Sequence, residues 1–250
     1  MDQIVLDVEM KALAPVAAEP VRRWIPRGAP ACGHADATPA GVGGVAGRAL
    51  FCRYEILAHS QRVQAYAVRI ARGLGLGGRQ LDVVRRGALL HDIGKFLLPA
   101  AILGKPGALT PAEWVTIRRH PLVGYLLLKD RPHLAEVSEV VLAHHERFDG
   151  TGYPRELIGE AIPLGARIVA VADVFAAVTS PRAYHLPQPI VPARDEIACH
   201  AGTHFDPAVV DAFLSIPAAE WEMLSPEGSA GSWAWSLFAF AGAGVKAGRA

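Results

Sequence analysis

The chain has 250 residues, of which 51% are apolar and 20% charged, which allows a sizeable core and argues against global disorder. Lysine plus arginine numbers 25 and aspartate plus glutamate 24, so the formal net charge at pH 7 is +1. This balance argues against bulk electrostatic binding of long nucleic acid, although it allows a single nucleotide to bind in a local pocket.

The sequence also indicates the cellular compartment in which the protein is expected. Its amino terminus, MDQIVLDVEMK, carries acidic residues where a signal peptide would carry lysine or arginine. The three cysteines lie far apart without a C-x-x-C pair, so we expect neither a disulfide framework nor a zinc knuckle. The longest uncharged run, residues 228–245, is interrupted by glycine and serine and falls short of the roughly 20 apolar residues of a spanning helix. We therefore expect a cytoplasmic protein without a membrane anchor.

Residues 1–49 are rich in alanine, proline and glycine and show no lasting helical or alternating period, which predicts an irregular leader or linker. From Tyr54 the pattern changes, and an amphipathic helix is expected that ends at the glycines of residues 73–78. The apolar stripe of this helix consists of Ile56, Val63, Ile70 and Leu74.

Further helices are expected over residues 81–91, 134–145 and 164–178. Another begins at Thr110, with proline in its first turn and Glu113 three residues on, and carries Trp114, Ile117 and His120 before Pro121. No segment shows a convincing strand alternation. The sequence thus predicts an all-α domain over residues 50–216, followed by a tail rich in glycine, serine and proline over residues 217–250.

Five of the ten histidines stand at the ends of expected helices or beside turn signals, each near a carboxylate or a matching partner: His59, His91, His120, His144 and His145. Glu55 precedes His59 by four residues and shares its helix face. Asp92 follows His91 at a helix end, and its two oxygens could bridge two metal ions. Asp173 lies in an apolar run, where a buried carboxylate needs a partner such as a metal.

Taken singly, each feature has a simpler interpretation: a solvated helical pair, a core histidine or a packing hydrogen bond. Their joint occurrence is more specific. Together with the surrounding motifs, they resemble the HD-GYP branch of the HD-domain phosphohydrolases over about residues 54–214. The matching segments are HDIGK at 91–95, ILGKPGALT at 102–110, His120, HHERFDGTGYP at 144–154, GEAIPLGARIVAVADVF at 159–175, TSPRAY at 179–184 and GTHFDP at 202–207.

This resemblance implies a bacterial, all-α HD-domain bundle with an HD-GYP extension, which hydrolyses the signalling dinucleotide cyclic di-GMP to pGpG, or further to GMP. It implies two or three divalent metal ions, iron or manganese, and the absence of thiolate donors suits that choice. The metal ligands carried over by motif are Glu55, His59, His91, Asp92, His120, His144, His145 and Asp173. Of these, Glu55 is the position associated with a third metal.

The resemblance assigns catalytic roles to Asp92 and to Lys95, which would contact the scissile phosphate and protonate the leaving group. Arg182 resembles the arginine that holds a phosphate through its bidentate fork. The GYP loop, Gly152, Tyr153 and Pro154, would shape the substrate pocket, dock a diguanylate cyclase domain, or both.

The sequence departs from the family pattern mainly after the expected ligands. The second aspartate of the usual ADxxD segment is Ala176, and a missing carboxylate that orients a ligand could cost roughly 10–100-fold. Other departures are Ala183, His185, Glu156 at a usual glycine, and three prolines within residues 186–192. Two alternatives therefore stay open: a catalytically weak module that binds nucleotide or a diguanylate cyclase, and a phosphohydrolase of other nucleotides, including other cyclic dinucleotides.

Overall fold

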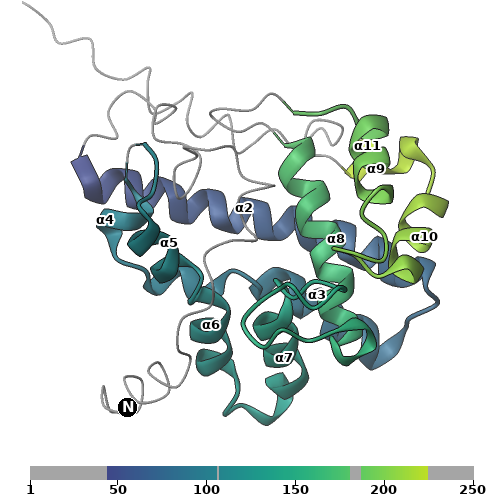
Figure 1. The fold of residues 1–250 in the computed structure, drawn as a ribbon, viewed down its shortest axis with the longest axis horizontal. Coiled ribbons are helices and arrows are strands. Elements are labelled where there is room, and N and C mark those ends of the chain that lie inside the picture. The colour runs from purple at the N-terminus through teal and green to yellow at the C-terminus, as the bar shows by residue number, and fades with distance from the viewer. Residues whose placement is uncertain (1–43, 106, 181–186, 225–250) are drawn as a thin grey trace, which may run out of the picture.

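The computed structural model describes residues 44–105, 107–180 and 187–224 (Figure 1). These residues are helical, which confirms the all-α prediction, and among them the only β-type pairing is an isolated bridge between Ala201 and Phe205. The α-helices are α2 (Gly44–Gly73), α3 (Gly78–Leu90), α4 (Ala100–Leu103), α5 (Pro111–Ile117), α6 (His120–Leu128), α7 (Ala135–Ala143), α8 (Leu164–Thr179), α9 (Ile190–Ala198), α10 (Pro207–Ser215) and α11 (Ala218–Leu224). Short 3-10 helices are η2 (Ile93–Leu97), η3 (Pro132–Leu134) and η4 (Gly159–Ala161).

Helix α2 runs along the long axis of the molecule, and α3 and α8 pack against it (Figure 1). It begins at Gly44, earlier than the expected start at Tyr54 and inside the expected leader. Cys52 and Ile56 of this first part pack against Leu103 of α4, and Arg48 Nε donates to the Gly104 carbonyl at 3.0 Å. Small residues hide the helical period here, and these tertiary contacts supply the stability that propensity does not.

The main core lies where α2, α3 and α8 meet α9, α10 and α11. Its aromatic centre consists of Tyr66, Phe175, Phe213 and Trp221, with ring centroids 4.9–5.5 Å apart in the contacting pairs. Trp221 belongs to α11, so residues 218–224, which we expected in the tail, form a helix that closes the core. Burial of this one large side chain explains why α11 is ordered against the domain.

The expected helix through Trp114, Ile117 and His120 is in fact two helices. Its start is confirmed, because Thr110 and Glu113 form a capping box at the beginning of α5. However, α5 ends at Ile117, and His120 is the first residue of α6. Pro121 is the reason: it lacks an N–H and is accommodated in the first turn of a helix, not in its interior.

The cysteines and several of the expected site residues also differ from expectation or lie outside the described part of the chain. Cys52 is disulfide-bonded, which the expectation of no disulfide framework did not foresee; Cys199 is free and exposed. Arg182, Ala183 and His185 lie outside the described residues, as do residues 1–43 and 225–250.

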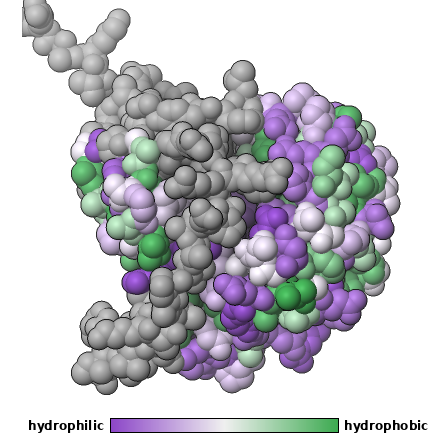
Figure 2. Space-filling view, in the orientation of Figure 1, coloured by the Kyte–Doolittle hydropathy of each residue, from purple (hydrophilic) through white to green (hydrophobic). Residues whose placement is uncertain are grey.

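No helix among the described residues has the length and apolar character to cross a membrane. On the face shown in Figure 2, hydrophilic and hydrophobic described residues are interspersed.

Candidate metal centre

The expected site histidines stand mainly at helix ends, where backbone carbonyls lack helical partners. His91 follows the last residue of α3, His120 begins α6, and His144 follows the last residue of α7. In each case the ring Nδ1 donates to the carbonyl three residues earlier, at 2.7 Å; the acceptors are Ala88, Ile117 and Val141. With the proton on Nδ1, each Nε2 presents a lone pair to the interior of the site, the arrangement that metal-ligating histidines commonly adopt.

The donor atoms gather in two groups. The His59 group consists of His59, His91 and Asp173, and the His120 group consists of His120, His144 and His145. Within each group the donor atoms lie within 4.8 Å of one another. In the His59 group, Nε2 of His59 lies 2.7 Å from Oδ1 of Asp173, although the two residues are 114 positions apart in sequence. Three imidazoles, or two imidazoles and a carboxylate, form a plausible donor set for a divalent transition metal.

Asp92 lies between the two groups. Its Oδ2 is 3.4 Å from Nε2 of His91, and its Oδ1 is 3.2 Å from Nε2 of His120 and 4.0 Å from Nε2 of His144. One carboxylate oxygen therefore faces each group, which is the geometry that a bridging ligand requires. Lys95, one turn further along, donates from Nζ to Oδ2 of Asp92 at 2.7 Å.

A close approach of two helices produces this geometry. A Cβ at Gly94 of η2 would lie 2.0 Å from the carbonyl oxygen of His120 and 2.8 Å from the backbone nitrogen of Gly124. Only glycine allows the HDIGK turn to touch the first turn of α6 in this way. That contact brings Asp92 and His120 within reach of each other.

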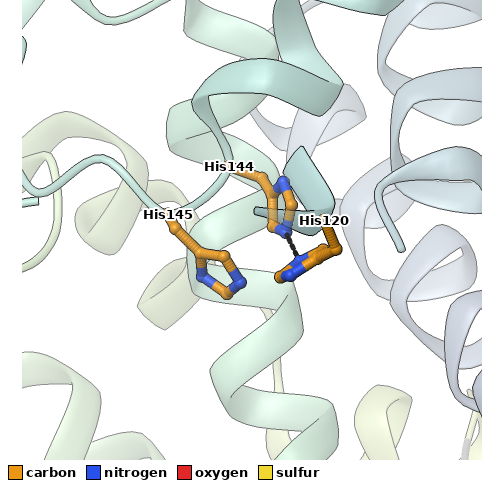
Figure 3. A group of neighbouring side chains, drawn as sticks. All are labelled: His120, His144 and His145. Atoms are coloured by element: carbon orange, nitrogen blue, oxygen red, sulfur yellow. Dashed lines mark hydrogen bonds between the residues drawn. The ribbon is translucent and has the colours of Figure 1, made fainter. Parts of the chain in front are cut away.

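Several features of the site fit a bound cation. Nε2 of His120 and Nε2 of His144 are 3.2 Å apart, and both rings use Nδ1–H for a backbone carbonyl (Figure 3). Two lone pairs at that distance repel unless a proton or a metal ion lies between them. In addition, Nε2 of His91 and Oδ1 of Asp92 are buried and make no hydrogen bond, an expensive arrangement without a ligand.

The electrostatics favour ligating protonation states. Burial lowers the pKa of His120, and burial together with neighbouring histidine charges holds the pKa values of His144 and His145 well below the usual range. Burial also opposes the charge on His91, but the Asp92 and Asp173 carboxylates outweigh it and raise the pKa of His91. Burial would raise the pKa values of Asp92 and Asp173, yet Lys95 and His59 respectively, with other histidines, hold them well below the usual range. Ionised carboxylates and mainly neutral imidazoles are the forms that bind metals.

Glu55 is placed differently from the other expected ligands. It lies one turn before His59 on α2 and is half-buried. The structure does not bring it into either of the two groups. A third metal at Glu55 therefore stays a prediction.

The loop after α7 carries the GYP residues and folds back on its own beginning. Glu146 is buried and its carboxylate accepts from the backbone N–H groups of Arg155 at 2.7 Å and Leu157 at 3.1 Å. A Cβ at Gly152 would lie 2.3 Å from the backbone nitrogen of Arg147, so glycine is required for this fold-back. The Tyr153–Pro154 peptide bond is cis. The closed loop holds the Tyr153 ring against His145, with centroids 4.9 Å apart.

The connection between α9 and α10 supports this loop from outside. The backbone N–H of Phe148 donates to the carbonyl of His204 at 3.2 Å, and that of Asp149 donates to the carbonyl of Thr203 at 2.8 Å. These residues belong to the GTHFDP segment, which the sequence marked only as part of the family resemblance. Its observed contacts make it a support for the GYP loop.

The chain matches a known protein family and several curated proteins. The HD domain family matches residues 49–209. The chain belongs to the HD-domain family. It is 44% identical over 156 residues to a cyclic di-GMP phosphodiesterase response regulator of Xanthomonas campestris, covering 62% of this chain and 41% of that protein. It is 39% identical over 159 residues to a 3'3'-cGAMP-specific phosphodiesterase of Vibrio cholerae, covering 63% of this chain and 30% of that protein.

Solved structures share the HD-domain fold. A cyclic GMP-AMP specific phosphodiesterase of V. cholerae superimposes with a TM-score of 0.53 at 20% identity, covering 72% of this chain and 48% of that one. An HD-GYP-type protein of Bdellovibrio bacteriovorus superimposes with a TM-score of 0.51 at 21% identity, covering 64% and 51%. The chain spans less than half the length of the curated relatives described above. These structural matches show the fold, and the family match shows the HD domain.

Two departures from the HD-GYP pattern have a visible structural setting. Ala176 lies one turn after Asp173 on α8 and is fully buried in the main core, where it offers no polar atom of its own side chain. Glu156 adopts a φ of 53°, in the left-handed region. The usual glycine of HD-GYP domains suits that backbone conformation without strain.

Sequence reasoning missed two residues that bear on the site. Glu146 follows the His144–His145 pair directly, and its place in the motif was a usable signal for a structural carboxylate. Arg118 lies outside every quoted motif, and its guanidinium carbon lies 4.2 Å from the centroid of the Tyr153 ring. Only the folded structure places it there.

Proposed function

We propose that this chain is a metal-dependent phosphodiesterase that hydrolyses cyclic di-GMP to pGpG, with GMP as a further product. The observation that carries the proposal is the position of Asp92, with one oxygen toward each of two histidine-rich groups. The names of the relatives, which are phosphodiesterases of cyclic dinucleotides, support the substrate class.

His59, His91 and Asp173 would hold one divalent ion, His120, His144 and His145 a second, and Asp92 would contact both. Iron or manganese suits these nitrogen and oxygen donors. When bound, the ions would supply Lewis acidity and a water molecule of lowered pKa for in-line attack on the phosphodiester. Glu55 would add a ligand if a third ion binds.

The chain's own groups have further roles in the reaction. Lys95 extends from the buried Asp92 carboxylate, and its side chain is a quarter exposed. It would face the phosphate on the solvent side, neutralise charge on the phosphoryl oxygens and give a proton to the leaving 3′-oxygen. Arg182 would hold a phosphate, and Gly152, Tyr153 and Pro154 would shape the wall of the pocket beside His145. The same GYP loop would offer a docking surface to a diguanylate cyclase domain in a bacterial cytoplasm.

The second candidate is a binding module with weak turnover. Ala176 favours it, because the buried position next to Asp173 carries no carboxylate that could orient a ligand or its water. The six donors of the His59 and His120 groups around Asp92, together with Lys95, favour the enzyme. A related question is the choice of dinucleotide, because the relatives include proteins named for cyclic di-GMP and for 3'3'-cGAMP.

The deciding experiment is product analysis after anaerobic loading with Fe(II) or Mn(II). Wild type, Asp92→Ala and Ala176→Asp would each be incubated with cyclic di-GMP, 3'3'-cGAMP and mononucleotides, and the products separated by chromatography. We expect pGpG from wild type and a loss of at least 100-fold in Asp92→Ala, because the group that links both metal sets is gone.

The other outcomes discriminate between the candidates. Intact substrate with stoichiometric metal in wild type, and turnover only in Ala176→Asp, would select the binding module. Faster turnover of 3'3'-cGAMP than of cyclic di-GMP would contradict the proposed substrate while leaving the reaction class in place.

A further inference from the structure

His145 is held differently from the other histidines near Asp92. The rings of His91, His120 and His144 are each fixed by an Nδ1–H bond to a backbone carbonyl. Among the described residues, the His145 ring makes no such bond to the backbone and instead contacts other rings. It packs on His144 with centroids 4.0 Å apart and stacks on Tyr153 at 4.9 Å with an interplanar angle of 26°.

Tyr153 is in turn held by Arg118. The guanidinium carbon lies 4.2 Å from the centroid of the ring, within the range of a cation–π contact. The ring cannot slide along His145 without losing this contact. Burial, with the nearby Asp92 and Asp173 carboxylates, raises the pKa of Tyr153, so its hydroxyl stays protonated.

The backbone around Arg118 is anchored to the same site. Arg118 caps the carboxyl end of α5, directly after Ile117, whose carbonyl accepts from the His120 ring. The short link between α5 and α6 therefore orients two members of the His120 group. It fixes His120 by a direct hydrogen bond, and it reaches His145 through the Arg118 side chain and the Tyr153 ring.

We propose that Arg118 is a positioning residue for His145, acting through the Tyr153 ring, and so tunes metal binding by the His120 group. This inference rests on the proposed metal-dependent function. A guanidinium suits the role because it is planar and delocalised and so stacks on the face of an aromatic ring. Positioning groups of this kind change metal affinity by roughly 10–100-fold when removed.

The test is Mn(II) binding to the full chain, followed by the electron paramagnetic resonance signal of free Mn(II), together with the thermal midpoint of each metal-free protein. The variants are Arg118→Met, Arg118→Lys, Tyr153→Leu and the double variant Arg118→Met/Tyr153→Leu. Arg119→Met is the matched control, since Arg119 is the exposed neighbour on the same turn. Methionine retains an apolar stem of similar length, which limits the structural effect.

We expect Arg118→Met to weaken one of two Mn(II) equivalents by about 10-fold and to leave the other unchanged. Arg118→Lys should recover part of the loss, and Arg119→Met should bind as wild type does. In the double variant, removal of Arg118 should add nothing to the effect of Tyr153→Leu, because the ring that transmits it is already absent.

Three results would overturn the inference. Both Mn(II) equivalents could be unchanged in Arg118→Met, even with a raised KM, which would assign Arg118 to substrate binding. Both equivalents could weaken together with a lowered thermal midpoint, which would assign it to general stability. Wild type could bind no Mn(II), which would also remove the manganese-dependent form of the proposed function, whereas the first two results leave that function intact.

Discussion

Glu156 is the only non-glycine residue of the described part of the chain with a positive φ. A side chain with a Cβ costs about 1–2 kcal/mol in the left-handed region, whereas glycine gives back roughly 0.5–1 kcal/mol through its freedom in the unfolded chain. We therefore expect Glu156→Gly to raise the free energy of unfolding by about 0.5–1 kcal/mol, measured by urea denaturation.

Glu156→Ala is the control for that prediction. It removes the carboxylate but keeps the Cβ, so its stability should stay near that of wild type. If alanine stabilises the protein as much as glycine does, the gain comes from charge rather than from backbone conformation, and the strain at residue 156 is refuted.

His204 makes stability depend on pH. Burial, with the charges of Arg147 and His200, lowers its pKa to about 3, against about 6.5 in an unfolded chain. Below pH 6.5 the unfolded state binds a proton that the folded state does not, so this contribution is complete above pH 6.5 and is lost as the pH falls toward 3. One unit below 6.5 the loss is about 1.4 kcal/mol.

The measurement compares wild type with His204→Gln in urea denaturation at pH 7.5 and pH 5.5, with a chelator present. Other buried histidines contribute to both proteins and cancel in the comparison. We expect the wild type to lose about 1.4 kcal/mol more than the variant over this interval. Equal losses in the two proteins would mean that His204 is protonated in the fold at pH 5.5.

The contact between η2 and α6 decides whether Asp92 meets His120. In Gly94→Ala the new Cβ would fall 2.0 Å from the His120 carbonyl oxygen, so the two elements must separate. Overpacking of this kind costs about 1–3 kcal/mol, and the separation should also move His120 away from Asp92. We expect a lower thermal midpoint and less Mn(II) bound per chain by elemental analysis.

Gly73→Ala is the matched control, because its Cβ would meet its nearest neighbour, the Ala212 carbonyl oxygen, at an ordinary 3.7 Å. Its midpoint and bound Mn(II) should match those of wild type. If Gly94→Ala also matches wild type in both measurements, the close approach does not position the site.

The ends of the helices also show which features of the fold local sequence patterns can predict. The Thr110–Glu113 pattern predicted the start of α5 correctly, because a capping box depends on residues three apart. The predicted end of the same helix was wrong, because α5 ends at Ile117 and His120 with Pro121 forms the first turn of α6. Likewise, the alanine and glycine content around residues 44–49 concealed the beginning of α2, which rests on contacts with α4.

Over the whole molecule, the sequence named every residue of the His59 and His120 groups, because the motifs carry donor types that a local segment can show. The sequence could not show which of these donor residues belong to the same group. That division depends on α8 crossing α2, so that Asp173 meets His59 from 114 positions away. The contact between Arg118 and Tyr153 is likewise tertiary, and no spacing in the sequence indicates it.

The folded domain extends beyond residue 216. We expected the domain to end at residue 216, whereas α11 inserts Trp221 into the aromatic centre with no exposed surface. A chain that ends at residue 216 lacks this side chain and leaves a cavity beside Tyr66, Phe175 and Phe213. Loss of a buried tryptophan costs about 3–5 kcal/mol, which is a large part of the stability of a domain.

We therefore expect a chain ending at residue 216 to unfold at a much lower temperature than one ending at residue 224, which keeps α11. Trp221→Ala in the full chain should account for most of that difference, because the remaining contacts of α11, such as the 2.6 Å ion pair of Glu220 with Arg69, are partly exposed and weak. Thermal unfolding followed by circular dichroism compares the three proteins. Equal midpoints for the chains ending at 216 and 224 would mean that the core closes without α11 and that the expected boundary is adequate.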